Sequence, residues 1–384
     1  MSLIESVRPL KDKLTAIRRD IHAHPELAFE EHRTAELVAR HLEALGIETH
    51  RGIGGTGVVG VVRGRRGLRA IGLRADMDAL PITERNEFAH KSTIQGCMHA
   101  CGHDGHTTML LGAAEALAAR RDFDGTVYLI FQPAEEGEGG APAMIADGLF
   151  ERFPMDAVFG MHNMPGLERG KLYFTAGPIM AAVDNWEIVL TGKGSHGSMP
   201  EKSIDPVVAG ASLVMALQTI VSRNVGAKDS AVVSVGAFLA GDAGNVIPQT
   251  ATLRLSIRSS APETRKLVLE KVKSITAAQA LSLGVSHEIR EGAPGAVLVN
   301  DPDQTIECAE VARALLGEDQ VVMPGPTFMG SEDFAYYAQK KPGTYCFIGN
   351  GDTPMVHHPM YDFDDRNLPI GAAWWVAVAE HFLK

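Results

Sequence analysis

Apolar side chains recur every three or four positions from Ile4 to Ile21 and again from about Glu30 to Leu45. This spacing gathers them on one face and predicts two amphipathic helices. Gly46 follows the second stretch directly, and helices commonly end before a glycine. Two apolar runs, from Gly57 to Val62 and from Arg69 to Leu73, then predict two strands.

Helical and strand patterns alternate beyond this point. Asp104 to Ala119 has the spacing of a helix, and Thr126 to Gln132 and Asp156 to Met161 are apolar runs that predict strands. Further helices are predicted at 303–316, 332–339 and 368–382, and a further strand at 344–348. Strands joined through helices build a parallel or mixed sheet with helices on its faces. The expected fold class is therefore α/β.

Residues 183–294 follow a different pattern. Strands are predicted at 185–190, 231–238, 250–259 and 285–291, and helices at 205–221 and 262–283. This β-α-β-β-α-β order is the ferredoxin-like arrangement of an α+β domain. A chain of 384 residues also exceeds the size at which one hydrophobic core stops growing. We therefore expect one domain from residues 1–182 and 295–384, with a second domain inserted at 183–294.

The composition is that of an ordinary globular protein, with 45% apolar and 22% charged residues. No run approaches the roughly 18 apolar residues that cross a bilayer, and the start lacks the apolar core of a signal peptide. A net charge of -11 disfavours nucleic acid as a partner, because that binding relies on surplus lysine and arginine. The four cysteines are too scattered for a disulfide framework. We expect reduced thiols, a cytoplasmic location, no membrane and a small-molecule partner.

The stretch from Met98 to His106 holds cysteine, histidine and aspartate side chains where the helix from Asp104 begins. Cys101 and His103 are two residues apart, a spacing at which side chains converge in a loop but diverge on a helix. A thiolate beside an imidazole suits zinc and its first-row neighbours better than calcium or magnesium. For Cys101 taken alone, a buried structural thiol is the alternative, since free cysteines mostly serve packing.

Further candidate ligands stand near the ends of predicted strands, where α/β sheets gather their ligands. Glu135 and Glu136 follow one strand, His162 follows the next, and His357 lies in a late loop. With the two residues of the earlier loop, this set exceeds what one tetrahedral metal takes from a protein. Two metals with a shared bridge would use five of the side chains and leave Glu135 free to carry a proton. A solvated acidic turn is the alternative for the glutamates, and His358 competes with His357.

Eight motifs follow one another along nearly the whole chain: His22-Ala-His24-Pro25-Glu26-Leu27, Arg74-Ala-Asp76-Met-Asp78-Ala-Leu-Pro81, Met98 to His106, Phe131-Gln-Pro-Ala-Glu-Glu136-Gly, Met161-His-Asn163, Gly194-Ser-His196-Gly, Gly244-Asn-Val-Ile-Pro248 and Gly330-Ser-Glu-Asp-Phe334. In this order they resemble the aminoacylase and hippurate-hydrolase amidohydrolases, a branch of the co-catalytic metallopeptidases. The ordered series is far more specific than any single motif.

The resemblance implies a ligand set for two divalent metal ions, with Glu135 as general base and acid. The implied ligands are Cys101, His103, Glu136, His162 and His357. Thiolate favours zinc, the branch is often seen with manganese, and nickel and cobalt are the alternatives. The wider superfamily has a His-x-Asp pair where this chain has Asp76-Met77-Asp78, and an aspartate bridge where it has Cys101. In this branch Asp78 would orient a ligand from behind.

The resemblance also implies that the inserted domain is a lid that pairs with a second copy, giving a homodimer or a dimer-based tetramer. His196 resembles the lid histidine that reaches the partner's site and steadies an oxyanion. Asn245 and Arg258 resemble lid groups that hold the substrate carboxylate, and a sheet-edge ion pair is the alternative for Arg258.

The predicted activity is hydrolysis of N-acyl or N-aroyl amino acids to a carboxylic acid and a free amino acid. The alternatives are a dipeptidase or carboxypeptidase with the same machinery, and a metal-dependent binding protein without turnover.

Overall fold

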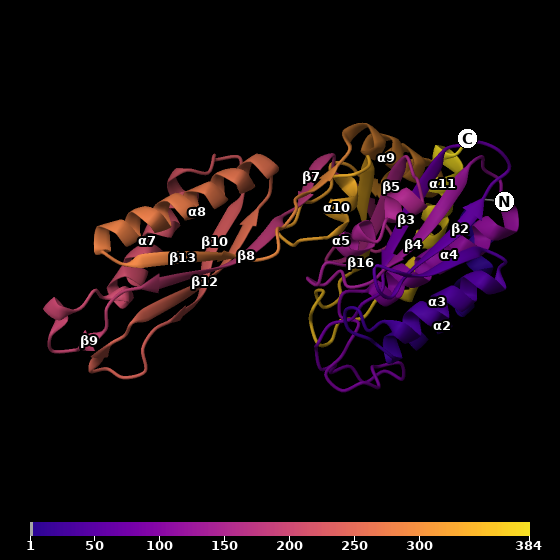
Figure 1. Ribbon diagram of the computed structural model, residues 1–384. Coiled ribbons are helices and arrows are strands. Elements are labelled where there is room, and N and C mark those ends of the chain that lie inside the picture. Colours follow the sequence, from indigo (N-terminus) through magenta and orange to yellow (C-terminus); the bar gives the residue numbers. More distant parts are fainter. Residues whose placement is uncertain (1–2) are drawn as a thin grey trace. The chain divides into compact units, whose positions relative to one another are not determined.

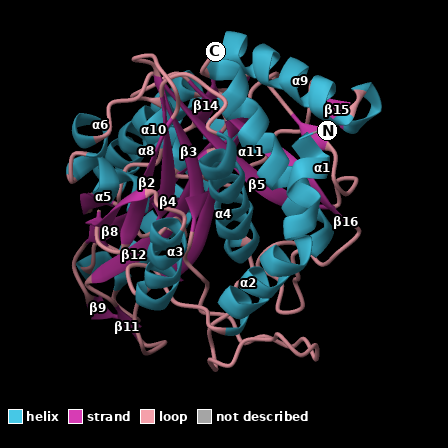
Figure 2. Ribbon diagram, turned by 90° about the vertical axis from the view of Figure 1, so that its right-hand side faces the viewer, coloured by secondary structure: helices cyan, strands magenta, loops and turns pink. Residues whose placement is uncertain are grey.

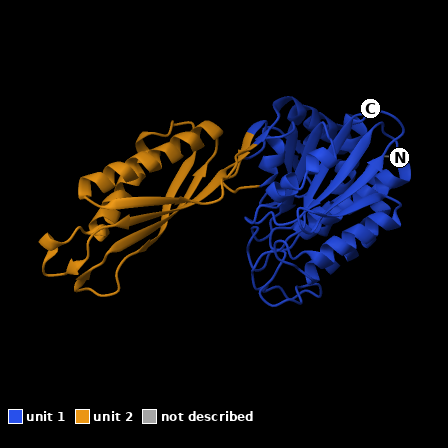
Figure 3. Cartoon of the chain, viewed as in Figure 1, with its two compact units in different colours: residues 1–177, 299–326, 333–384 blue, residues 178–298, 327–332 orange. Residues whose placement is uncertain are grey.

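The computed structural model describes residues 3–384 and divides into two compact units (Figure 3). Unit 1 comprises Met1–Gly177, Val299–Pro326 and Asp333–Lys384, and unit 2 comprises Pro178–Leu298 and Thr327–Glu332. The sequence pattern does not predict the short second segment of unit 2, Thr327–Glu332, because it places these residues in the first domain. The division into a catalytic domain, 1–182 with 295–384, and a lid domain, 183–294, stays a proposal about what the units do.

Unit 1 is built on an eight-stranded mixed sheet in the order β1-β2-β4-β3-β5-β16-β6-β15. Its centre consists of four parallel strands: β4 (Thr126–Gln132), β3 (Ala70–Asp76), β5 (Ala157–Pro165) and β16 (Gly343–Gly351). These strands are almost completely buried, as expected where helices cover both faces of a parallel sheet. Their carboxyl ends meet at one edge, so the side chains that follow them are brought together there.

The outer strands of this sheet are β1 (Glu48–Ile53), β2 (Gly57–Arg63), β6 (Leu172–Tyr173) and β15 (Val321–Val322). Helices α2 (Lys11–Ala23), α3 (His32–Ala44), α4 (His103–Arg120) and α11 (Leu368–Phe382) are seen in front of the strands in Figure 2. The remaining helices of unit 1 are α1 (Leu3–Val7), α5 (Gly140–Ala146), α6 (Leu149–Arg152), α9 (Pro302–Leu316) and α10 (Phe334–Ala338). Helix α4 is buried on nearly all sides because it packs against the sheet, α2 and α11.

Unit 2 is an antiparallel sheet in the order β10-β12-β8-β13, with two long helices packed on it (Figure 1). Its elements are β8 (Ala182–Thr191), α7 (Pro206–Arg223), β10 (Ala231–Leu239), β12 (Thr250–Ser259), α8 (Pro262–Leu283) and β13 (Ser286–Glu291). This topology is the ferredoxin-like one, so the predicted fold class is confirmed. Two short strands, β9 (Ser195–His196) and β11 (Val246–Ile247), form a separate two-stranded sheet. Strands β7 (Gly177–Met180) and β14 (Leu298–Asn300) form another.

Several element predictions are wrong in detail. The strands expected to end at Leu73 and Met161 continue to Asp76 and Pro165, so His162 lies within β5 and does not follow it. The helix expected from Ile4 to Ile21 is interrupted by a 3-10 turn at Arg8–Leu10, because Pro9 cannot donate the hydrogen bond that a continuous helix needs. The helix expected from Glu332 begins only at Phe334. Among the described residues, α7 alone has the length and composition to cross a membrane. Helices that cover a sheet often pass the same test, and α7 packs on the sheet of unit 2.

Candidate metal centre

The loop that carries Cys101 and His103 is shaped by the glycine between them. Gly102 caps α4 with a φ of 96°, a left-handed conformation that side chains other than glycine rarely adopt. A Cβ atom at this position would lie 2.2 Å from Asn163 Nδ2 and 2.5 Å from Tyr361 Oη. Only glycine therefore fits, and the tight turn directs its two neighbours to the carboxyl edge of the sheet.

Asn163 fastens this loop to strand β5. Its side-chain amide donates to the Cys101 carbonyl at 2.7 Å, and its amide oxygen accepts from the Tyr361 hydroxyl at 2.6 Å. Its backbone N–H donates to His106 Nε2 at 3.0 Å. All of these groups are buried, so the position of Cys101 is fixed before any ligand arrives.

The structure brings the predicted metal ligands together in two overlapping groups. The side-chain donor atoms of Cys101, His103 and His162 all lie within 4.8 Å of one another. Those of Cys101, Glu136 and His357 form a second such group. Cys101 belongs to both groups, with its sulfur 3.3 Å from His162 Nε2. Together the two groups offer five donors, more than one tetrahedral metal takes from a protein, so these residues could hold two cations.

The two histidines of the first group are each oriented by a hydrogen bond at Nδ1, the ring nitrogen that faces away from the cluster. His103 Nδ1 lies 2.9 Å from the Asp78 carbonyl and 3.2 Å from its carboxylate, and His162 Nδ1 donates to the Asn163 carbonyl. Each Nε2 atom is thereby left to face the cluster. His103 Nε2 is buried and makes no hydrogen bond within residues 3–384, an unusual state for a buried polar atom. A metal ion satisfies this atom directly, so the residues fit the group that the sequence predicts.

The pKa shifts differ from one proposed ligand to the next. Burial, reinforced by Glu136, raises the pKa of the Cys101 thiol well above its usual value, whereas a bound cation would favour the thiolate. Burial lowers the pKa of His162 well below its usual range, which keeps this imidazole neutral as a ligand must be. Burial also opposes the charge of His103, but the carboxylates of Asp76, Asp78 and Glu136 together outweigh it and raise the pKa to about 10. Sulfur, imidazole and carboxylate donors together suit divalent first-row metals.

His357 reaches the cluster from the loop after β16. Its φ is 68°, a left-handed conformation that costs a non-glycine residue roughly 1 to 3 kcal/mol and is typical of functional sites. Its N–H donates to the Ala100 carbonyl at 2.7 Å, and its Nε2 lies 3.1 Å from Glu136 Oε1. The neighbouring His358 instead accepts from the Met360 N–H at 3.1 Å.

Glu135 lies beside the cluster, with a carboxylate oxygen within 4.8 Å of the donor atoms of His103 and Glu136. It follows Ala134, which also has a positive φ, of 53°. The N–H of Asp333 donates to Glu135 Oε1 at 3.3 Å, and the N–H of Glu136 donates to the Asp78 carboxylate at 2.9 Å. The two adjacent carboxylates are thus held in different environments, one in the ligand group and one next to it.

The three predicted residues of unit 2 do not form one cluster within that unit. His196 and Asn245 are exposed neighbours, because β9 pairs with β11 and the Gly197 N–H donates to the Asn245 carbonyl at 2.7 Å. Arg258 is half-buried near the end of β12, and its Nη1 donates to the Met329 carbonyl at 2.8 Å. The β9–β11 ladder adjoins the opposite end of β12, where Gly192 N donates to the Gln249 carbonyl. Thr250 and Arg258 are eight steps apart along the strand, which is about 26 Å at the usual rise.

Several buried groups behind the cluster are not evident from the sequence pattern. Asp76 accepts from His106 Nδ1 at 2.6 Å and from Arg74 Nη1 at 2.6 Å. In the sequence, Asp76 is noticed only within the motif from Arg74 to Pro81, and His106 only as the last residue of the stretch from Met98. The signal that could have identified Asp76 is the strand pattern itself, which continues to that residue in β3.

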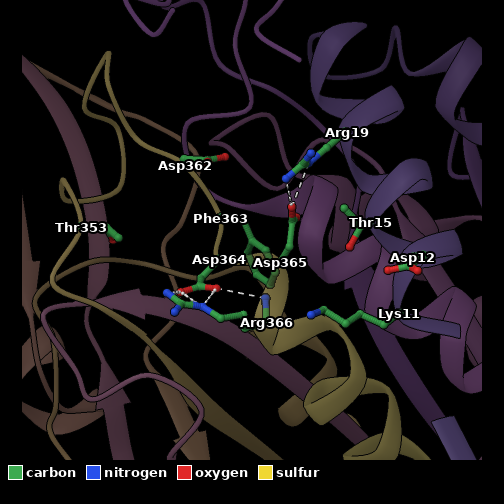
Figure 4. A pocket seen from close by; sticks show the side chains of 10 residues that line it. All are labelled: Lys11, Asp12, Thr15, Arg19, Thr353, Asp362, Phe363, Asp364, Asp365 and Arg366. Atoms are coloured by element: carbon green, nitrogen blue, oxygen red, sulfur yellow. Dashed lines mark hydrogen bonds and ion pairs between the residues drawn. The ribbon is translucent and has the colours of Figure 1, made fainter. Parts of the chain in front are cut away.

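A separate cavity of about 560 Å³ lies between α2 and the loop at residues 362–366 (Figure 4). Its charged side chains are largely paired with each other, as in the bonds from Arg19 to Asp365 and from Arg366 to Asp364. None of the predicted ligands lines it, so it carries no part of the chemistry described above.

Comparison with known proteins places the metal cluster in context. The model of peptidase family M20/M25/M40 matches residues 72–381. The hippurate hydrolase of Campylobacter jejuni is 45% identical over 384 residues, covering 100% of both chains. An IAA-amino acid hydrolase of Arabidopsis thaliana is 41% identical and covers 97% of this chain and 86% of its own.

Among solved structures, a dinuclear metal binding peptidase of Bacillus subtilis superposes with a TM-score of 0.87. It is 35% identical and covers 98% of this chain and 99% of its own. The likeness therefore extends over both units and not only over the ligand motifs.

Proposed function

The chain belongs to peptidase family M20/M25/M40, and we propose that it is a dinuclear metal-dependent amidohydrolase acting on N-acyl and N-aroyl amino acids. The observation that carries the proposal is the convergence of four donor side chains on Cys101, with Glu135 alongside. The names of the similar proteins, which hydrolyse hippurate and an IAA-amino acid conjugate, support the substrate class.

The residues that would hold the two metals are Cys101, His103, His162, Glu136 and His357. Two bound divalent ions supply Lewis-acid polarisation of the amide carbonyl and make water acidic enough to attack near neutral pH. Glu135 then takes the proton of the attacking water and delivers it to the leaving nitrogen. Proton transfer of this kind typically contributes about 10² to 10⁴ in rate.

The test of this function removes the proton carrier and keeps the ligands. Glu135→Gln should lower kcat for benzoyl-glycine by about 10² to 10⁴, because the amide cannot accept the proton. Bound metal, measured by atomic emission, should stay at the wild-type level, since Glu135 is not a proposed ligand. Undiminished hydrolysis by this variant would falsify the proposed role.

We propose zinc or manganese as the metal, with nickel and cobalt as alternatives. The thiolate favours zinc because both are comparatively soft, and the resemblance to the hippurate-hydrolase branch favours manganese. Metal-free protein reconstituted with each ion in turn, followed by a turnover assay, ranks them directly. A carboxypeptidase of Saccharolobus solfataricus is also 36% identical, so the assay should include simple dipeptides beside benzoyl-glycine. Faster cleavage of dipeptides would move the proposal to a peptidase.

We propose that two copies of the chain pair through unit 2. Strand β10 is at the edge of its sheet, and such edges offer unpaired backbone groups to a partner. Exposed apolar side chains are present on β10 and on helix α7, which packs against it: Val208, Met215, Val232, Phe238 and Leu239. The position of the three candidate residues gives a second reason. His196 and Asn245 lie beyond one end of β12 and Arg258 lies near the other end, so one small substrate cannot touch all three within a single unit 2.

Light scattering at micromolar concentration should therefore show a homodimer or a dimer-based tetramer, and a monomer would contradict the pairing. Met215→Lys, which places a charge in the apolar surface, should shift the equilibrium towards monomer. Its matched control is Leu281→Lys, an exposed apolar position on α8. We keep the cytoplasm as the proposed location, which the four free cysteines support.

A further inference from the structure

A fully buried arginine stands behind the cluster and donates in three directions. Arg74, on β3, donates from Nε to Gln132 at 2.8 Å, from Nη1 to Asp76 at 2.6 Å and from Nη2 to Asp333 at 2.9 Å. Its exposed fraction is 1%. Burying a guanidinium costs several kcal/mol unless carboxylates and hydrogen bonds neutralise it. The reaction described above uses none of these groups, so the arrangement needs another explanation.

Asp333 is held on both of its carboxylate oxygens. Oδ1 accepts from Arg74 and from Gln132 Nε2 at 2.8 Å, and Oδ2 accepts from Gln132 Nε2 at 2.9 Å and from the Ala141 N–H at 2.8 Å. The backbone N–H of the same residue donates to Glu135 Oε1. The side chain of Asp333 therefore fixes the backbone group that touches the proton carrier.

We propose that Asp333 is a positioning residue for Glu135, and that Arg74 holds Asp333 in place. The inference rests on the proposed function, because it takes Glu135 as the general base. A base must lie within hydrogen-bond reach of the proton it takes, and a displacement of about 1 Å can cost roughly 10² in rate. Fixing the Asp333 N–H limits the positions that the Glu135 carboxylate can take while it accepts this hydrogen bond.

The other side of Arg74 extends this support to the ligands. Its Nη1 bonds Asp76, Asp76 bonds His106, and His106 accepts from the backbone N–H of Asn163, the neighbour of His162. One buried cation thus links the support of the base to the support of a proposed ligand. The separation between the base and the proposed ligands then depends on one buried hydrogen-bond network within unit 1.

Asp333→Asn tests the anchor. Both oxygens of Asp333 accept hydrogen bonds, so an amide in its place must turn an NH₂ group towards a donor. The turn should shift and carry the backbone N–H away from Glu135. We expect kcat to fall about 10- to 100-fold, the usual effect of removing a group that supports a site residue. KM and bound metal per subunit should stay unchanged.

Asp184→Asn is the matched control. Asp184 is also a buried carboxylate paired with an arginine, since Arg265 donates to it at 2.8 and 2.6 Å. It belongs to unit 2 and has no place in the proposed chemistry. Both variants should lose stability in urea, but only Asp333→Asn should lose kcat. An equal loss of kcat in both, or loss of metal by Asp333→Asn, would overturn the inference.

A double-mutant cycle separates a positioning role from a structural one. If Asp333 acts through Glu135, then Asp333→Asn should have almost no further effect on kcat in the Glu135→Gln background. The same 10- to 100-fold loss in both backgrounds would overturn the inference and leave the proposed function intact. Full activity of Glu135→Gln alone would instead contradict the proposed function.

Arg74→Lys provides an independent variant should Asp333→Asn not fold. Lysine keeps the charge but lacks the fork that reaches Gln132, Asp76 and Asp333 together. It should lower kcat as Asp333→Asn does, again only when Glu135 is present. An additive loss in the Glu135→Gln background would overturn the inference by this second route.

Discussion

The proposed ligand cluster of unit 1 and the candidate residues of unit 2 differ in how firmly the chain holds them. Cys101, His103 and His162 are buried, and each is fixed by a hydrogen bond or by a turn with a single allowed residue. In unit 2, His196 is exposed, and its ring bonds only a neighbouring serine, Ser198, at 2.8 Å among the described residues. Arg258 donates to a backbone carbonyl of its own unit.

This difference separates two kinds of site. Groups that bind metal need a fixed geometry before the metal arrives, and packing within one unit supplies it. Groups that contact a substrate, or the site of a partner subunit, meet their target only when it is present. The chain alone therefore determines the first set of positions and leaves the second set open to test.

Gly102→Ala should have the largest effect, because it removes the fixed turn of the cluster. The new methyl group would combine a left-handed strain with contacts to Asn163 and Tyr361 under 3 Å. We expect the free energy of unfolding to fall by about 3 kcal/mol or more, together with loss of bound metal and of measurable turnover. Urea unfolding and metal analysis check both effects.

Gly96→Ala is the control for strain without crowding. Gly96 has a φ of 78°, and nothing lies within 4 Å of its virtual Cβ. This variant should lose roughly 1 kcal/mol and keep its metal. Equal losses in the two variants would mean that close packing around Gly102 does not shape the cluster.

The sequence predicts the cluster better than its surroundings for a physical reason. Cys101, His103 and the glycine between them are contiguous, and the apolar runs show approximately where strands end, although β3 and β5 continue to Asp76 and Pro165. The network of Arg74 and Asp333 joins residues 259 positions apart in sequence, and no local pattern marks such a pair. The separation of His196 from Arg258 follows from strand order and register, which only the folded chain reveals.

His196→Ala should have the next largest effect, and only on turnover. If His196 stabilises the oxyanion, its loss should lower kcat by about 10² to 10³ with bound metal unchanged. His287→Ala is the control, since His287 is an exposed histidine on β13 of the same unit. A comparable loss from both variants would remove the proposed role.

Mixing variants shows which subunit His196 serves. In a mixed dimer of His196→Ala and Glu135→Gln chains, a site built across the two subunits would combine an intact Glu135 with an intact His196. Such a dimer should recover about half of the wild-type activity, because one of its two sites is complete. No recovery on mixing would place His196 in the site of its own chain.

Arg258 should give the smallest effect and decide whether unit 2 binds the substrate carboxylate. Loss of a charged hydrogen bond is worth about 1.5 kcal/mol, so Arg258→Ala should raise KM about tenfold with little change in kcat. Arg254→Ala is the matched control, because Arg254 lies on the same strand and pairs with Glu187 at the surface. If Arg258 only fastens the Met329 carbonyl, the variant should unfold at lower urea concentration and keep its KM. That outcome would assign Arg258 to the structure of unit 2 and leave the substrate carboxylate to other groups.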